Sequence, residues 1–385
     1  MENIQRQLRM ALPAGQSAFL WGARKVGKSS WLKQQFPDSL YFDLLKTDLM
    51  IAFTQRPALL RELILAADQS QRQKPIIIDE VQKVPHLLDE VQGLIEDRGL
   101  SFILCGSSAR KLKRGQGNLL GGRAWRFAML PLTARELGEI DLLQALNRGL
   151  VPAHYLQSQY RRSLRAYLDD YLKEEVFDEG LTRNIPAFSR FFEAIGYSHG
   201  ELTNYANIAR ECGVDAKTVK EYYQILVDTL LGSFVPPFKP RQNRNIISKA
   251  AKFYLFDVGV AGALQRRELS AARGEDFGRA FEHFIYMELY AQRAYGELDH
   301  PIEFWRTKSG QEVDFVLDSG RVAIEVKGTD RLRSADLHGI KTFVDAYQPR
   351  QAFIVCQEPR ERLVDGIRIL PWQLFLERLW RGEII

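Results

Sequence analysis

The chain has 385 residues, of which 45% are hydrophobic and 26% charged, and its net charge is +5 at pH 7. This length exceeds what one hydrophobic core supports, so we expect two or three domains. No apolar run reaches the roughly 18 residues of a membrane span, and Met1–Met10 lacks the apolar part of a secretion signal. These features favour a cytoplasmic protein without membrane contact.

The mildly positive charge permits a nucleic-acid partner without requiring one, because the distribution of charge matters more than its sum.

The cysteines Cys105, Cys212 and Cys356 form no CxxC pair, and each lies among apolar residues. This spacing predicts buried, reduced thiols rather than a metal or redox site.

The first motif lies between a short apolar strand, Ala18–Trp21, and a helix. Gly22–Ser29 follows the pattern GxxxxGK[ST]. Its glycines let backbone N–H groups turn toward phosphates, and the helix N-terminus adds its positive end. We expect ATP here, with Lys28 on the β- and γ-phosphates and Ser29 on Mg²⁺. The candidate cofactor-binding residues are Gly22, Ala23, Arg24, Lys25, Val26, Gly27, Lys28, Ser29, Ser30 and, from a later strand, Ser107.

A second strand ends in two acids. The β-branched residues Ile76–Ile78 suit a parallel strand that is covered on both faces, and Asp79 and Glu80 follow it. We expect Asp79 to hold Mg²⁺ through water. Glu80 would polarise the attacking water, a role commonly worth about 10²–10⁴ in rate. The pair favours ATP hydrolysis over binding alone.

A third strand, Ser101–Cys105, should lie beside the second. Ser107 or Ser108 would then reach the γ-phosphate, although a plain serine helix cap is an equal alternative. The basic, glycine-rich loop at 110–126 has three interpretations: an arginine finger for a neighbouring subunit, a nucleic-acid contact, or a solvated surface loop. Arg123 is the candidate finger because it leaves the glycines just before a strand-like run.

The middle region predicts helices over residues 131–195 and then a winged helix. Leu202–Glu211 and Ala216–Leu231 predict two helices around a glycine-containing turn, which is the helix-turn-helix pattern. Strands on either side of a basic tip at residues 239–244 would form the wing. One interpretation is that the second helix and the wing bind duplex DNA, and the other is that the module packs between subunits.

The last third predicts a hairpin of two strands, Gln311–Leu317 and Arg321–Lys327. Asp314 lies at the centre of the first strand, and Glu325 and Lys327 share a face of the second. Charged groups in apolar strands are costly unless they are paired or bound to metal. Asp followed by Glu-x-Lys is the PD-(D/E)xK arrangement of restriction-type nucleases.

The nuclease interpretation assigns a role to each acid. Asp314 and Glu325 would bind Mg²⁺, Lys327 would orient or activate water, and Glu282 on the preceding helix could add a carboxylate ligand. The alternatives are a salt bridge on an exposed sheet face and a degenerate nuclease fold that does not cut.

Nearly end to end, the chain resembles the bacterial and archaeal AAA-type P-loop ATPases that carry the C-terminal domain of unknown function 4143, which is restriction-endonuclease-like. The resemblance implies an α/β chain with an AAA-type ATPase domain at 1–135, a helical and winged-helix domain at 136–260, and a nuclease-like α/β domain at 261–385. Its marks are the P-loop with Asp79–Glu80, Gly106–Ser108, Gly122–Arg123 before Leu130–Leu132, Lys252–Gly259, Glu312–Phe315 and Ile324–Lys327.

The leading hypothesis is therefore an ATP- and Mg²⁺-dependent homo-oligomer that processes DNA, with a possible endonuclease site. The catalytic candidates are Glu80, Lys28, Arg123, Asp314, Glu325 and Lys327, and the metal-binding candidates are Ser29, Asp79, Glu282, Asp314 and Glu325. One alternative is a nucleotide-switched regulator that binds DNA or a partner and has an inactive nuclease-like domain. A third hypothesis is an ATPase that acts on protein partners.

Overall fold

The structure is a computed structural model that describes residues 4–107, 120–178, 184–240 and 250–385. Two compact units are distinguished. The N-terminal unit contains Leu8–Leu130 and Leu226–Leu231, and the C-terminal unit contains Met1–Gln7, Pro131–Ile225 and Gly232–Ile385. Ser108, most of the basic loop after it and the predicted wing tip at 241–244 lie outside the described residues.

The N-terminal unit is built on a sheet whose five described strands are all parallel, in the order β2-β3-β4-β1-β5. Every residue of β1, β3 and β4 is buried, which requires cover on both faces and explains their uninterrupted apolar sequences. The predicted position of β4 beside β3 is confirmed. The elements are β1 (Ser17–Trp21), α1 (Lys28–Gln35), β2 (Tyr41–Asp43), α2 (Thr47–Gln55), α3 (Ala58–Ala66), α4 (Gln69–Arg72), β3 (Ile76–Asp79), η1 (Val81–Lys83), α5 (Leu87–Arg98), β4 (Phe102–Gly106), η2 (Leu120–Gly122) and β5 (Ala124–Ala128).

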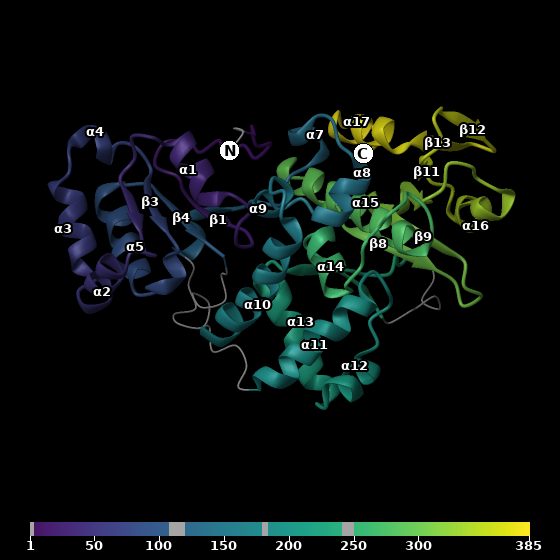
Figure 1. Ribbon diagram of the computed structural model, residues 1–385. Helices are drawn as coiled ribbons and strands as arrows, with labels where there is room; N and C mark the ends of the chain where they lie inside the picture. Colours follow the sequence, from purple (N-terminus) through teal and green to yellow (C-terminus); the bar gives the residue numbers. More distant parts are fainter. Residues whose placement is uncertain (1–3, 108–119, 179–183, 241–249) are drawn as a thin grey trace. The chain divides into compact units, whose positions relative to one another are not determined.

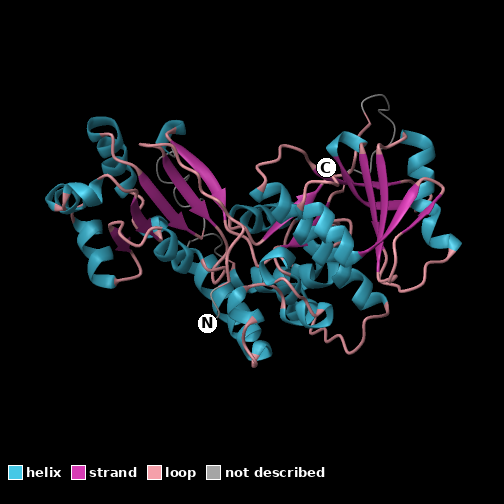
Figure 2. Ribbon diagram, turned by 90° about the horizontal axis from the view of Figure 1, so that it is seen from above, coloured by secondary structure: helices cyan, strands magenta, loops and turns pink. Residues whose placement is uncertain are grey.

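The register of this sheet fixes where its loops emerge. Trp21 pairs with Gly106 and Ala128, and Asp79 pairs with Cys105, so these strands end level with one another. The segments that follow β1, β3 and β4 therefore leave from one edge, which is where ligands gather in parallel α/β sheets. Figures 1 and 2 show the strands of this unit with the helices α1–α5 around them.

The C-terminal unit begins with a helical region. Gly213 takes a left-handed conformation after α12, and Asp215 then accepts a hydrogen bond from the backbone N–H of Thr218 at the start of α13. The strands β6 and β7 form an antiparallel pair. The winged helix remains a prediction. The elements are α7 (Ala134–Leu137), α8 (Leu142–Arg148), α9 (Pro152–Tyr155), α10 (Tyr160–Asp178), α11 (Ile185–Ser198), α12 (Tyr205–Cys212), α13 (Ala216–Asp228), β6 (Gly232–Val235), β7 (Lys252–Leu255) and α14 (Val258–Leu264).

A long helix and a mixed sheet complete this unit. The sheet has six described strands in the order β12-β13-β11-β10-β9-β8, and β9 and β10 form the predicted antiparallel hairpin through a turn at Asp318–Gly320. Apolar residues of α15 pack with residues of this sheet and of α8 in one core cluster. The elements are α15 (Glu275–Tyr295), β8 (Ile302–Arg306), β9 (Glu312–Leu317), η3 (Asp318–Gly320), β10 (Val322–Val326), η4 (Ser334–Leu337), α16 (His338–Tyr347), β11 (Gln351–Cys356), β12 (Arg362–Val364), β13 (Ile367–Pro371) and α17 (Trp372–Trp380).

Residues 136–260 and 261–385, which the sequence assigns to separate domains, contribute to the same compact unit. The domain boundaries at 135 and 260 remain predictions. The three cysteines are buried and free, as expected. In the part of the chain that the structure describes, no helix combines the length and apolar character needed to cross a membrane.

Candidate nucleotide site and a buried carboxylate cluster

The P-loop connects β1 to α1 at the carboxyl edge of the sheet. Gly22 has no room for a side chain, because a Cβ atom there would lie 2.4 Å from the carbonyl oxygen of Met129. Lys25 and Gly27 have positive φ angles of 66° and 98°, which turn the loop back on itself. α1 begins without a side-chain cap, so its first N–H groups face the loop with the positive end of the helix.

Lys28 is held at the same loop. Its side chain is buried, and its Nζ donates to the carbonyl oxygens of Gly22 at 2.7 Å and Ala23 at 3.0 Å. The ammonium therefore lies inside the curve of the loop rather than in solvent. Ser29 is the next residue and is partly exposed. The loop, the uncapped helix and the enclosed ammonium together form a cradle that suits the phosphates of a nucleotide.

Asp79 is the last residue of β3, which pairs directly with β4. Its Oδ2 accepts a hydrogen bond of 2.5 Å from the hydroxyl of Tyr41, and its Oδ1 accepts one of 3.1 Å from the backbone N–H of Glu80. Burial, followed by the hydrogen bond to Asp79, raises the pKa of Tyr41, so the phenol stays protonated and donates. Burial also raises the pKa of the Cys105 thiol, which lies opposite Asp79 in the sheet. Asp79 has no ion-pair partner among the described residues.

Glu80 adopts a left-handed backbone conformation, with φ 58° and ψ 41°. Such a conformation is uncommon for a residue with a long side chain and is concentrated at functional sites. Gln82 holds the side chain of Glu80: its Nε2 donates to Glu80 Oε2 at 2.5 Å and to the hydroxyl of Ser107 at 3.2 Å. Gln82 thus joins the carboxylate after β3 to the serine after β4.

The amide oxygen of Gln82 is buried and has no hydrogen-bond partner among the described residues. Gly106 leaves space for it, since a Cβ atom at position 106 would lie 2.3 Å from that oxygen. A buried acceptor without a hydrogen bond is costly, so the two hydrogen bonds of the Gln82 amide nitrogen are made at the expense of its oxygen.

Arg123 lies at the opposite edge of the sheet. It directly precedes β5, whose first residue pairs with Ser17 and whose last pairs with Trp21. Five strand residues at about 3.3 Å each place Arg123 about 16 Å along the sheet from the P-loop. Its guanidinium is half-exposed and forms a 2.8 Å ion pair with Glu96. Arg123 does not approach the P-loop of its own chain, so a finger role would require a neighbouring copy.

The predicted nuclease residues do converge in the C-terminal unit. Asp314 on β9, Glu325 on β10 and Glu282 on α15 lie together, and Lys327 Nζ contacts Glu325 Oε1 at 2.6 Å. Asp314 Oδ2 accepts a 2.8 Å hydrogen bond from the backbone N–H of Val326. Asp314 and Glu325 are buried, which contradicts the alternative of a salt bridge on an exposed sheet face.

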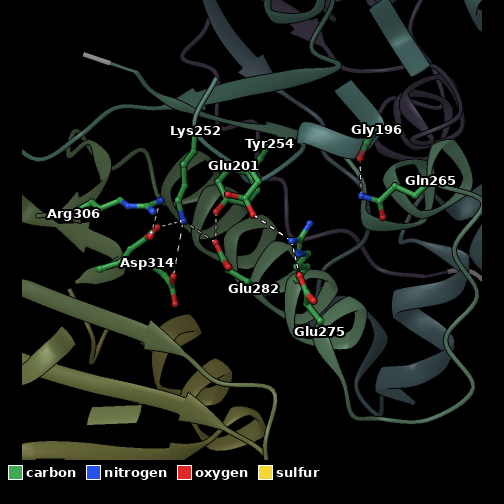
Figure 3. A network of polar contacts seen from close by, with 11 residues as sticks. Gly196, Glu201, Lys252, Tyr254, Gln265, Glu275, Glu282, Arg306 and Asp314 are labelled. Carbon is green, nitrogen blue, oxygen red and sulfur yellow. Dashed lines mark hydrogen bonds and ion pairs between the residues drawn. The ribbon is translucent and has the colours of Figure 1, made fainter. Parts of the chain in front are cut away.

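Sequence reasoning missed Lys252, which lies at the centre of this cluster. Figure 3 shows its side chain extending between Glu282 and Asp314. Lys252 Nζ lies 2.6 Å from Glu312 Oε1, 3.2 Å from Glu282 Oε1 and 3.9 Å from Asp314 Oδ1. Tyr254, two residues along β7, also donates to Glu282. We call Glu282, Glu312, Asp314 and Glu325 the carboxylate cluster.

The charges of the cluster act on one another. Burial, then the charges of Glu325 and Glu282, raise the pKa of Asp314 well above its usual range. Burial raises the pKa of Glu325 to about 6, against the opposing effect of Lys327. Burial lowers the pKa of Lys252, but the carboxylates beginning with Glu282 outweigh it and the net shift is upward. Lys252 is therefore a charged ammonium at neutral pH.

The carboxylate cluster does not form a ready metal site. Within the ranges that the structure describes, no group of three or more His, Cys, Asp or Glu side chains is arranged to hold a metal ion. The oxygen donors are of the kind that Mg²⁺ prefers, but the ammonium of Lys252 lies among them. The residues thus have suitable chemistry and an arrangement that already contains a cation.

The missed residues left weak signals in the sequence. Lys252 and Tyr254 are two residues apart in a strand, so both had to share one face of β7. Gln82 lies two residues after Glu80, and Tyr41 lies on the short strand β2, earlier in the chain than Asp79 and Glu80. None of these patterns indicates which residues the side chains contact.

Three family models match separate parts of the chain. An AAA domain matches residues 15–138, a domain of unknown function (DUF8612) matches residues 139–271, and another (DUF4143) matches residues 277–375. The N-terminal match agrees with the parallel sheet and the P-loop, and supports an AAA-type ATPase domain there. The DUF4143 match agrees with the resemblance drawn from the sequence and assigns no activity.

The chain is also similar to several proteins over most of its length. The uncharacterized proteins Rv2008c of Mycobacterium tuberculosis and Mb2031c of Mycobacterium bovis are each 25% identical to it over 315 residues, which cover 77% of this chain and 68% of the relative. The uncharacterized protein MJ1544 of Methanocaldococcus jannaschii is 20% identical over 417 aligned positions, covering 96% of this chain and 91% of the relative.

One solved structure, the ORC1 protein of Aeropyrum pernix in complex with DNA, is 13% identical in sequence. The match covers 66% of this chain and 87% of the ORC1 chain, with a TM-score of 0.25. A TM-score this low is too weak to transfer a domain arrangement or a partner.

Proposed function

We propose that the chain is a Mg²⁺-dependent ATPase whose reaction takes place at the carboxyl edge of the N-terminal sheet. The observation that carries this proposal is the convergence of the P-loop, Asp79–Glu80 and Ser107 at the ends of three neighbouring strands. Lys28 and the N-terminus of α1 would hold the phosphates. Ser29 and Asp79 would hold Mg²⁺, which neutralises charge on the phosphates.

The residues after β3 and β4 would act on the attacking water. Glu80 would accept its proton, Ser107 would contact the γ-phosphate, and Gln82 would fix both by its two hydrogen bonds. Arg123 would act only from a neighbouring subunit, which makes this part of the proposal depend on a homo-oligomer.

We further propose that hydrolysis is coupled to DNA. Its support is the helix pair α12–α13, where Lys217 and Lys220 are exposed at the start of α13, although the exposed Glu221 beside them would repel phosphate. Lysines on a second helix after a short glycine turn are placed as in helix-turn-helix proteins. A specific observation also favours the alternative of a nucleotide-switched binding protein: Lys252 fills the carboxylate cluster on which DNA cleavage would depend.

The test is ATP turnover by the full chain with and without duplex, forked and single-stranded DNA. Glu80→Gln should keep ATP binding and lose hydrolysis by roughly 10²–10⁴-fold. Glu62→Gln is the matched control, since Glu62 is exposed on α3 and pairs only with Arg56 in the described part of the chain. Equal turnover in both variants would refute the role of Glu80, and no ATP turnover by the unmodified chain would refute the ATPase assignment.

The DNA part has its own readout from the same samples. Replacing Lys217 and Lys220 by alanine should weaken DNA binding and reduce the slope of log affinity against log salt by about one for each phosphate that the protein no longer neutralises. Turnover indifferent to every DNA form, together with no DNA affinity at low salt, would favour an ATPase that acts on protein partners.

A further inference from the structure

The carboxylate cluster has the composition of a cation site and is arranged around one buried lysine. Glu282, Glu312 and Asp314 each direct an oxygen at Lys252 Nζ, within 2.6–3.9 Å. An ammonium group has three N–H donors and no acceptor, so it can serve three oxygens at once. The lysine stem is buried too, and its Nζ lies 5.6 Å from the centre of the Phe304 ring.

A second observation points to a cation independently of the lysine. Glu325 is only 5% exposed, and its Oε2 is buried with no hydrogen-bond partner in the described residues. Its other oxygen contacts Lys327 at 2.6 Å. Asp314 Oδ2 accepts a hydrogen bond from the backbone N–H of Val326, the residue after Glu325, so the two acids lie side by side on the paired strands β9 and β10. A buried, unpartnered carboxylate oxygen beside a second acid is a free ligand position for a positive ion.

The lysine and a divalent ion compete for the same oxygens of the cluster. A Mg²⁺ or Mn²⁺ ion bound by Asp314 and Glu282 would lie about 2 Å from their oxygens. The same oxygens lie 3.2 Å and 3.9 Å from the ammonium, so the two cations would be separated by at most about 5 Å in a buried site. Their repulsion opposes the binding of a divalent ion while the ammonium is in place.

We propose that the ammonium group of Lys252 occupies the cation position of the carboxylate cluster, so that the site takes a divalent cation only when this lysine is withdrawn or replaced. Asp314 and the free oxygen of Glu325 are then the first ligands of the uncovered site, with Glu282 as the third. Lys252 is a competitor of the metal and has no catalytic role.

The experiment measures Mn²⁺ binding to the full chain by calorimetry and by the electron paramagnetic resonance signal of free Mn²⁺. Nucleotide is absent from every sample, so ATP hydrolysis has no bearing on the result. Lys252→Met should bind one Mn²⁺ at least about tenfold more tightly than the unmodified chain, because the competing charge is gone. Lys252→Arg keeps the charge and should resemble the unmodified chain, and Lys341→Met, which removes an exposed lysine paired with Asp365, should change nothing.

Two further variants keep the result interpretable. Lys252→Met with Asp314→Asn should lose the gained Mn²⁺ site, which distinguishes it from metal bound at the P-loop. Lys252→Met with Glu312→Gln removes one charge of each sign and keeps all three proposed ligands, so it tests the site if the single variant is too unstable. Mn²⁺ should raise the melting temperature of this double variant and of Lys252→Met, but not that of the unmodified chain.

Two results would overturn the proposal. One is Mn²⁺ binding by the unmodified chain that is as tight as in Lys252→Met and is lost on Asp314→Asn, since the lysine would then exclude nothing. The other is a folded Lys252→Met, or a folded double variant with Glu312→Gln, that binds no Mn²⁺.

Discussion

Replacing Asp257 by alanine should destabilise the C-terminal unit strongly, because this one carboxylate satisfies three buried backbone donors. Its Oδ1 accepts from Gly259 at 3.0 Å and Val260 at 2.9 Å at the start of α14, and its Oδ2 accepts from Leu150 at 2.6 Å. Asp257 is fully buried, and a Cβ atom on Gly149 would lie 2.0 Å from its Oδ1. Water therefore has little room to replace the carboxylate.

The expected loss follows from these donors. A helix cap is worth about 1 kcal/mol, and a buried N–H left without an acceptor costs about 1–3 kcal/mol. Asp257→Ala should thus lower the free energy of unfolding by roughly 2–5 kcal/mol, a large part of the 5–15 kcal/mol of an ordinary domain. Asp257→Asn, which keeps one acceptor oxygen, should lose less.

The assay is urea unfolding combined with hydrogen exchange in peptides from α14, which separates this unit from the other. Asp141→Ala is the matched control: Asp141 is an exposed cap of α8 that accepts one N–H, from Gln144 at 2.9 Å. It should cost about 1 kcal/mol. Equal losses in the two variants would show that burial and the extra donors contribute nothing, and would refute the reasoning.

Three further predictions concern the two units. Gln82→Ala should lower kcat at least about tenfold with unchanged ATP affinity, because Glu80 loses a hydrogen-bond donor worth about 1.5–3 kcal/mol. Stopped-flow nucleotide binding measures the affinity and steady-state turnover measures kcat. An unchanged kcat would exclude a positioning role for Gln82. Tyr41→Phe should raise the Mg²⁺ concentration needed for half-maximal turnover roughly tenfold, since Asp79 loses the hydrogen bond that orients it. Turnover measured over a Mg²⁺ titration tests this prediction, and an unshifted curve would contradict it. Burial lowers the pKa of His283 from 6.5 to about 3, so the unfolded chain binds a proton between these values that the folded chain does not. Stability should therefore fall as the pH drops through this window, by roughly 2 kcal/mol from His283 between about pH 7.5 and 5, and urea unfolding of His283→Gln should show a correspondingly smaller loss.

Much of the N-terminal fold could be predicted because its signals are local. Three β-branched residues in a row, a glycine pattern and an acid pair each act within a few positions of the chain, and β3 and the P-loop lie where those patterns put them. Arg123 shows the limit of such reasoning. Its place depends on the parallel pairing of β5 with β1, a contact between segments about a hundred residues apart, and that pairing sets it at the edge away from the P-loop.

The C-terminal site could be predicted only in part for the same reason. Asp314 and Glu325 belong to one hairpin, so their meeting follows from the turn between them. Lys252 reaches them from a separate strand pair, and a lysine at the start of a strand ordinarily extends into solvent. Only the packing of β7 against α15 and β9 brings its ammonium among the acids, and no local pattern encodes that packing.

The two acidic sites satisfy their carboxylates in opposite ways, and this difference bears on what each can bind. Asp79 receives its side-chain hydrogen bond from the neutral phenol of Tyr41, which fixes the carboxylate and leaves its negative charge available to an external cation. Glu282 also accepts a hydrogen bond from a phenol, that of Tyr254. In addition, the ammonium of Lys252 places a full positive charge beside Glu282 and beside Asp314. A neutral donor orients a metal ligand, whereas a charged one competes with the metal. If both proposals hold, the same residue types would bind Mg²⁺ at the P-loop and an internal cation in the carboxylate cluster.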